Sequence, residues 1–543
     1  MRRLLLPHQR TNLPMRNRND VATFWYASSM TTCLRKNGLI ILMSLFLLIL
    51  HLAAINQAWQ LHRDEYLYLA QGNHLAWGYL AVPPTIAFLG FICKLFGYSV
   101  FIIRLFPALF GALTVYMIGK IVIEMKGGLF AQFIACLSYI AAGYLRMNLL
   151  FQPNSMDVLY FTICVYYTVR YIHTSSNRYI IYCGILIGLG LLNKYTMALF
   201  PIGMLMGLLL TPHRKLFKEK KLYVALLIAF IIFLPNLLWE YFHHFPILIQ
   251  LHTLQKYQLK HLDTATFIKG QLVNCFPSLF VWLAGLLFYL FAKSGKPYRI
   301  FGWIYLTIIV VLILSNGKDY YAMGAYPMLM AGGGVFLEKL THKMILKWSL
   351  RPVMTAVMIW LAIPMFLICI PMFSPAKMAK YCAKYKSLGV LRWEDGQNHA
   401  LPMDFADMLG WKEMTNKVVA GYDSLDSSEK ANTIIFCDNY GEAGAVAIYG
   451  RKNDLPQVQC KEAGFIFWNP MHQQFDNLIL VTDDTFDIHR PLLTKNFKQV
   501  TEVGSVTDPY AREQGTMILL CKGANEVIIN FINTRQQELR SKY

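Results

Sequence analysis

Acidic residues near apolar segments are the first candidates for chemistry in this sequence. Only ten Asp and Glu residues occur among the first 373, and a carboxylate near a bilayer is costly unless it is paired or used. Adjacent Asp64 and Glu65, preceded by Arg63, could supply a general base and a partner that tunes it. A solvated loop with an Arg–carboxylate pair is the alternative. Asp157 is the second candidate, with an acid favoured by a helix N-terminus as its alternative.

Two lysines and one possible metal site come next. Lys194 stands between two apolar runs that are too close for an ordinary loop, and Lys318 precedes another run. A lysine held at the membrane surface could neutralise a lipid phosphate, whereas a snorkelling anchor is the alternative. Glu240 and His243 have side chains that bind metals, but their spacing fixes no geometry. An interfacial helix cap is favoured there over a metal site.

The elements that must position these residues are mostly apolar. The 543 residues are 56% hydrophobic and 15% charged, against about 25% charged in a soluble domain. Residues 1–373 hold 32 basic and 10 acidic residues, whereas residues 374–543 hold 19 and 21. The excess positive charge therefore lies in the apolar part, which excludes a single soluble core, a disordered chain and a nucleic-acid binder.

This pattern predicts a multi-pass α-helical membrane protein with a small soluble α/β domain. Residues 1–36 form a basic cytoplasmic N-terminus and residues 37–373 a transmembrane catalytic domain, with a first periplasmic loop at 56–98. Residues 374–543 form a periplasmic domain. Eleven apolar runs of about twenty residues, the length needed to cross a bilayer, fall at 37–55, 99–123, 128–146, 155–173, 178–192, 195–211, 222–240, 267–292, 299–315, 320–337 and 353–373.

The basic loops set the orientation of these runs. Alternation places Pro212–Lys221, Lys293–Arg299 and Glu338–Arg351 inside, as the positive-inside rule requires. An odd number of spans leaves the C-terminal domain outside. Val82–Phe96 is apolar but short and contains Lys94, and counting it as a span would invert the later loops. We therefore expect it to form a re-entrant or membrane-surface helix.

The pattern after Ser374 changes to short β runs and helices. The sequence predicts three strands and two helices there, in an order typical of a small α/β domain. The strands are Thr433–Cys437, Leu478–Thr482 and Thr516–Cys521, and the helices are Gly441–Gly450 and Asn525–Arg540.

Short motifs occur in a fixed order along nearly the whole chain. After Arg63–Tyr66 they are GYLAVPP (78–84), LFGYS (95–99), RLFPA (104–108), GLGLLNKYT (188–196), LPN (234–236), Tyr320-Tyr321 with Tyr326-Pro327, and DNYGEAGA (438–445) with Leu455-Pro456. Their order and the topology resemble the family 39 glycosyltransferases of the GT-C fold. This family includes dolichyl-phosphate-mannose–protein mannosyltransferases and the bacterial lipid A aminoarabinose transferase.

The resemblance implies an enzyme of the bacterial inner membrane, a hexosyl- or pentosyltransferase. Its donor would be a polyprenyl-phosphate sugar, and its acceptor a lipid, glycan or protein on the outer face. No cofactor is expected to be required, and a divalent metal is left open. A transporter or flippase for lipid-linked sugars is the alternative, which the clustering of acids at one face and the external domain disfavour.

The resemblance also assigns roles to particular residues. Asp64 matches the acidic motif and is implied as the base, and Lys194 matches a lysine near the donor phosphate. The full set that we expect at the site comprises the catalytic acids Asp64, Glu65 and Asp157 and the donor-phosphate residues Lys194, Lys318, Tyr320 and Tyr321.

Overall fold

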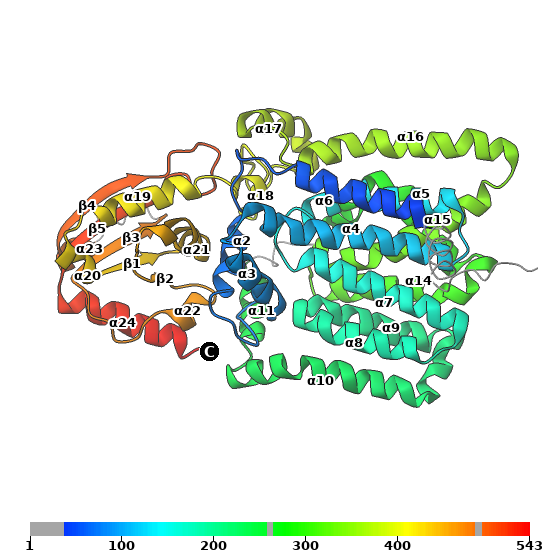
Figure 1. Ribbon diagram of the computed structural model, residues 1–543, viewed down its shortest axis with the longest axis horizontal. Helices are drawn as coiled ribbons and strands as arrows, with labels where there is room; N and C mark the ends of the chain where they lie inside the picture. The colour runs from blue at the N-terminus through cyan, green and yellow to red at the C-terminus, as the bar shows by residue number, and fades with distance from the viewer. Residues whose placement is uncertain (1–36, 258–263, 484–490) are drawn as a thin grey trace, which may run out of the picture.

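The computed structural model describes residues 37–257, 264–483 and 491–543. Figure 1 shows a bundle of helices running side by side, with an α/β layer at one end. The short helices α2 and α3 lie where the two parts meet. Outside the first loop (56–98), the described residues up to 373 form the following α-helices: Asn37–Ala53, α4 (Val100–Glu124), α5 (Leu129–Ile140), α6 (Tyr144–Met147), α7 (Asn154–Thr174), α8 (Arg178–Asn193), α9 (Leu199–Leu209), α10 (Lys220–Phe242), α11 (Pro246–Tyr257), α12 (Thr264–Asn274), α13 (Leu279–Leu290), α14 (Arg299–Leu314), α15 (Tyr326–Leu340) and α16 (Met344–Cys369).

Each of the eleven apolar runs lies on one of these helices or on consecutive ones. By length and composition, however, four of the described helices could cross a membrane, or six if each of two bent pairs forms one span. Helices such as α5, with 12 residues, cover only about 18 Å of a hydrocarbon layer about 30 Å thick. The mostly helical, multi-pass architecture is therefore confirmed, while the number of eleven spans stays a prediction.

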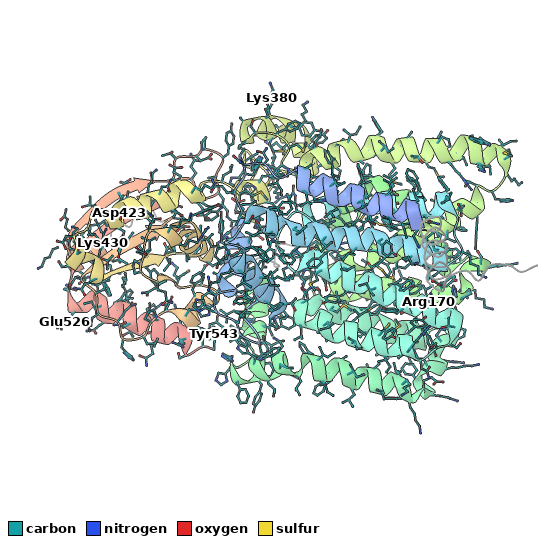
Figure 2. The ribbon with its side chains drawn as sticks, in the orientation of Figure 1. Arg170, Lys380, Asp423, Lys430, Glu526 and Tyr543 are labelled. Atoms are coloured by element: carbon teal, nitrogen blue, oxygen red, sulfur yellow. The ribbon has the colours of Figure 1, made fainter. Side chains whose placement is uncertain are left out.

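Two of the most basic loops lie together at the end of the bundle away from the α/β layer. They contain the 3₁₀ helices η2 (Pro212–Lys218) and η5 (Lys293–Tyr298), which meet where His213 Nε2 lies 2.8 Å from the Pro297 carbonyl oxygen. η5 also contacts α7, whose last turns carry Arg170 at this same end in Figure 2. Both loops therefore lie on one side of the bundle, as the alternation requires.

The first loop forms α2 (Arg63–Gln71) and α3 (Thr85–Leu95). α3 has 11 residues, about half the length needed to cross the hydrocarbon layer, in keeping with a re-entrant or surface helix. The two helices are in close contact, because a Cβ at Gly72 would lie 2.5 Å from backbone atoms of Gly90 and its neighbour. Only a residue without a side chain fits there.

The C-terminal part is a five-stranded sheet with helices. Its order is β2-β1-β3-β5-β4, with β1 parallel to β2 and β3, and β5 antiparallel to β3 and β4. The strands are β1 (Thr433–Cys437), β2 (Val458–Cys460), β3 (Asn477–Thr482), β4 (Phe497–Ser505) and β5 (Met517–Ala524). The helices are α17 (Pro375–Cys382), α18 (Met403–Ala406), α19 (Trp411–Asp423), α20 (Ser427–Ala431), α21 (Tyr440–Tyr449), α22 (Phe465–Trp468), α23 (Pro491–Asn496) and α24 (Glu526–Arg540).

The three predicted strands and two predicted helices of this part are confirmed, with ends that coincide or shift by at most three residues. β2 and β4 were missed. β2 has only three residues, and β4 is largely exposed at the edge of the sheet, so neither has an apolar run.

The first loop and the α/β layer share one hydrophobic core. Tyr66 of α2 is buried against Trp411 of α19, with ring centres 5.3 Å apart. α21 lies directly on α2, because a Cβ at Gly444 would be 2.8 Å from Tyr66 and one at Gly441 would be 2.5 Å from the Arg63 side chain. The glycines of the sequence GEAGA therefore permit this close approach. The C-terminal domain and the first loop pack as one unit.

Candidate active site

Asp64 lies in the first turn of α2, where the bundle meets the C-terminal domain. Both of its carboxylate oxygens accept hydrogen bonds. Tyr440 Oη, from the first residue of α21, donates to Oδ1 at 2.8 Å, and Gln152 Nε2 donates to Oδ2 at 3.1 Å. The Asp64 side chain is only half-buried. A carboxylate with a fixed direction and an open side is suited to accept a proton from a substrate.

Two side-chain amides connect Asp64 to Lys194. Lys194 Nζ donates to Asn154 Oδ1, Asn154 Nδ2 donates to Gln152 Oε1 at 2.7 Å, and Gln152 donates to Asp64. A lysine has only donors and a carboxylate only acceptors. The lysine and the carboxylate therefore fix the orientation of both amides between them. This hydrogen-bond chain links the predicted base to the predicted phosphate-binding lysine.

Lys194 also faces the two predicted tyrosines. Its Nζ lies 5.1 Å from the ring centre of Tyr320 and 5.0 Å from that of Tyr321, in the 3₁₀ helix η6 (Asp319–Ala325). Tyr68 of α2 and Asp64 are electrostatic neighbours of Tyr320. The structure therefore brings Asp64, Lys194, Tyr320 and Tyr321 into one cluster, although they come from three distant parts of the sequence.

Asp157 is a buried charged neighbour of Lys194. The side chain is 5% exposed, and Thr196 Oγ1 donates to its Oδ2 at 2.8 Å. Within the described part of the chain, Asp157 Oδ1 has no hydrogen-bond partner, and Lys194 acts on the carboxylate electrostatically. These contacts favour a role in holding the lysine over a role as the base.

Glu65 does not join this cluster. It is 0% exposed, and its Oε1 pairs with Arg104 and accepts from the Phe151 backbone N–H at 2.6 Å. Its Oε2 accepts from the His62 backbone N–H at 2.7 Å and so caps α2. The expectation that Glu65 is one of the catalytic acids is corrected by these contacts, because both of its oxygens are used to fix the start of α2.

Lys318 points towards the C-terminal domain. Its Nζ lies 3.3 Å from Glu394 Oε1, although it remains an electrostatic neighbour of Lys194. This pairing favours a second role, in which Lys318 ties η6 to the C-terminal domain.

Glu240 and His243, at the end of α10, have partners within the protein. Tyr195 Oη donates to Glu240 Oε1 at 2.8 Å, and the ring of His243 stacks on Trp239 at 4.1 Å. Among residues 37–257, 264–483 and 491–543, no group of three His, Cys, Asp or Glu side chains is placed to hold a metal ion. The contacts fit the interfacial cap that the sequence favours.

Sequence reasoning assigned no role to Tyr440, Gln152 or Asn154. Tyr440 lies in the motif DNYGEAGA, and Gln152 and Asn154 flank Pro153 just before the candidate Asp157. Burial and the nearby Asp64 charge raise the pKa of Tyr440 well above its ordinary value. Its hydroxyl therefore stays protonated and acts as a donor to Asp64.

Comparison with known proteins gives a family match over part of the chain and a fold. Residues 81–239 match the family described as dolichyl-phosphate-mannose-protein mannosyltransferase. No curated protein sequence matches the chain significantly.

Among solved structures, ArnT from Cupriavidus metallidurans bound to undecaprenyl phosphate is 14% identical, with a TM-score of 0.60 over 89% of this chain and 98% of that one. Its apo form matches equally well. The oligosaccharyltransferase of Archaeoglobus fulgidus, in complex with Zn and sulfate, has a TM-score of 0.50 at 10% identity over 82% of this chain and 68% of that one. These matches confirm the resemblance to glycosyltransferases of the GT-C fold.

Proposed function

We propose that this GT-C-type membrane glycosyltransferase takes a sugar from a polyprenyl-phosphate donor and transfers it to an acceptor hydroxyl at the outer membrane surface. The family match and the fold support the reaction class, and the ArnT structure that holds undecaprenyl phosphate supports the donor class. The acceptor is a lipid, glycan or protein, and the sugar a hexose or a pentose.

The chemistry needs one base and one cation. The acceptor oxygen forms a bond to the anomeric carbon while the bond from that carbon to the phosphate oxygen breaks, and the hydroxyl proton passes to Asp64. The electron pair of the broken bond leaves with the polyprenyl phosphate, a stable anion that needs little acid assistance. Lys194, between Tyr320 and Tyr321, holds this phosphate. Direct displacement inverts the anomeric centre.

The amide chain from Asp64 to Lys194 is the observation that carries this proposal. Two groups of opposite charge, from the first loop and from the end of α8, are held at a fixed separation by Gln152 and Asn154. Surface anchors or solvated loop charges need no such connection. A site that must place an acceptor hydroxyl next to a phosphate-linked sugar does need it.

The proposed orientation in the membrane rests on the basic loops. We propose that the C-terminal domain, residues 374–543, lies in the periplasm of a bacterium, with the catalytic domain at 37–373 in the inner membrane and residues 1–36 in the cytoplasm. Support comes from η2 and η5, which lie together at the end of the bundle that carries Arg170 in Figure 2, away from α2 in Figure 1.

The test is transfer by the purified protein in lipid nanodiscs. It is incubated with polyprenyl-phosphate sugars and membrane extract, and mass spectrometry identifies what gains a sugar. Asp64→Asn should lower turnover by about a hundredfold to ten-thousandfold, the usual range for general-base assistance. Asp423→Asn, a surface acid at the far end of the C-terminal domain in Figure 2, is the matched control and should keep full turnover.

Two outcomes would contradict the proposal. Asp64→Asn with more than roughly a tenth of wild-type turnover, above the range that loss of a base allows, would remove Asp64 as the base. Movement of the lipid-linked sugar across a proteoliposome membrane without any glycosylated product would instead favour a flippase.

A further inference from the structure

The C-terminal domain contacts the predicted base through the side chain of Tyr440. Tyr440 Oη donates to Asp64 Oδ1 across 376 residues of sequence, and the Arg63 guanidinium carbon lies 4.5 Å from the centre of the Tyr440 ring. The opposite oxygen of Asp64 is held by Gln152, from the bundle. The carboxylate is therefore held between the two parts of the protein.

The place of Tyr440 is fixed by its own domain. β1 ends at Cys437, and Asn439 then caps α21, with its side chain accepting from the backbone N–H groups of Gly441 and Glu442. The Glu442 carboxylate in turn accepts from the Asn439 backbone N–H, which completes a capping box. Tyr440 is thus the first residue of a capped helix that follows the carboxyl end of the parallel strand β1, and this helix packs on α2.

We propose that Tyr440 is a positioning residue through which the C-terminal domain sets the direction of the Asp64 carboxylate. This inference rests on the proposed role of Asp64 as the base. A hydrogen bond from a fixed donor restricts the rotation of the carboxylate. Without Tyr440, the carboxylate is held by Gln152 alone and points less often towards the acceptor.

Tyr440→Phe removes the hydroxyl and keeps the ring beneath Arg63. Turnover should fall about tenfold to a hundredfold, as misplacement of a catalytic group by about 1 Å does, while the donor KM stays within about twofold.

Tyr449→Phe is the matched control. Tyr449 lies on the same helix and meets the same loop, but its hydroxyl bonds to that of Tyr66 at 3.1 Å and not to Asp64. It should leave the turnover and the donor KM unchanged. Equal losses in both variants would mean that the contact between α21 and α2 acts only structurally, and would overturn the inference.

A second substitution covers the case in which Tyr440→Phe folds poorly. 3-Fluorotyrosine at position 440 keeps the shape and is a stronger acid, so its hydroxyl is a stronger donor. The Asp64 carboxylate then keeps its donor, so turnover should stay within about twofold of the wild type, and a loss of about tenfold or more, as expected for a misplaced base, would overturn the inference. The base assignment fails separately, if Asp64→Asn stays active. A wild-type-like Tyr440→Phe beside an inactive Asp64→Asn overturns only the role of Tyr440.

Discussion

Replacing Lys194 with methionine should impair both folding and donor binding. The lysine faces the buried carboxylate of Asp157, which has an oxygen without a partner among the described residues. The Lys194 ammonium and the Asp157 carboxylate form no direct ion pair among the described residues. At a separation of about 5–7 Å and an effective dielectric constant of about 20, their attraction is about 2–3 kcal/mol. Lys194→Met removes this attraction and leaves the carboxylate buried.

The double variant Lys194→Met with Asp157→Asn separates the two effects. Neutralising Asp157 should restore most of the lost stability, because no unpaired charge remains. Donor binding should stay weak, because a charge-assisted contact to a phosphate, about 1.5–3 kcal/mol, corresponds to about a tenfold to 150-fold increase in the donor KM.

The assay measures thermal unfolding in detergent and the donor KM for the wild type, both single variants and the double variant. Unchanged melting of Lys194→Met would refute the electrostatic link to Asp157. A double variant with a wild-type donor KM would refute the contact between Lys194 and the phosphate.

Four further predictions concern the topology, two acidic residues and metal dependence. An impermeant thiol reagent applied from outside should label a cysteine placed at Gly317 and miss one at Gly295, and the reverse pattern would contradict the orientation. Glu65→Gln should destabilise the protein by about 3–5 kcal/mol, because it leaves the buried Arg104 cation without its negatively charged partner. The protein that still folds should keep its donor KM. Although burial opposes it, Arg146 at 2.7 Å and His62 lower the pKa of Asp404 below its ordinary value. Asp404→Asn should therefore destabilise the protein at pH 7 by about 1.5–3 kcal/mol, and the difference should diminish as the pH falls below about 3.9 and Asp404 becomes protonated. Incubation with a chelator should leave turnover unchanged, since Lys194 provides the positive charge at the phosphate, and loss of turnover that Mg²⁺ or Mn²⁺ restores would contradict this.

The helices of the bundle could be predicted from the sequence because their signal is local. A run of apolar residues between basic loops predicts an apolar helix from the local sequence alone, without information from the rest of the chain. Thus all eleven runs lie on helices, and the short, Lys94-containing segment Val82–Phe96 contains the short helix α3. The number of crossings does not follow in the same way, because helices such as α5 and α8 are shorter than the hydrocarbon layer.

The candidate site was only partly visible because its contacts are long-range. Asp64 and Lys194 stand out as charges next to apolar runs, and the structure places them in one cluster. Glu65 has the same residue type and the same neighbourhood in sequence, yet its side chain points to Arg104. Successive residues of a helix face about 100° apart, so adjacent acids face different surroundings. Tyr440 is recognisable only when the C-terminal domain is packed on α2.

The packing of α21 on α2 also sets an order of events during synthesis. Asp64 leaves the ribosome 376 residues ahead of Tyr440, and at about 5–20 residues per second this interval lasts roughly 20–75 s. Throughout that time the first loop lacks the domain that completes its core. In the proposed orientation, the loop is exposed outside the membrane with Tyr66 unburied, and the proposed activity begins only after the last part of the chain has been translocated and folded.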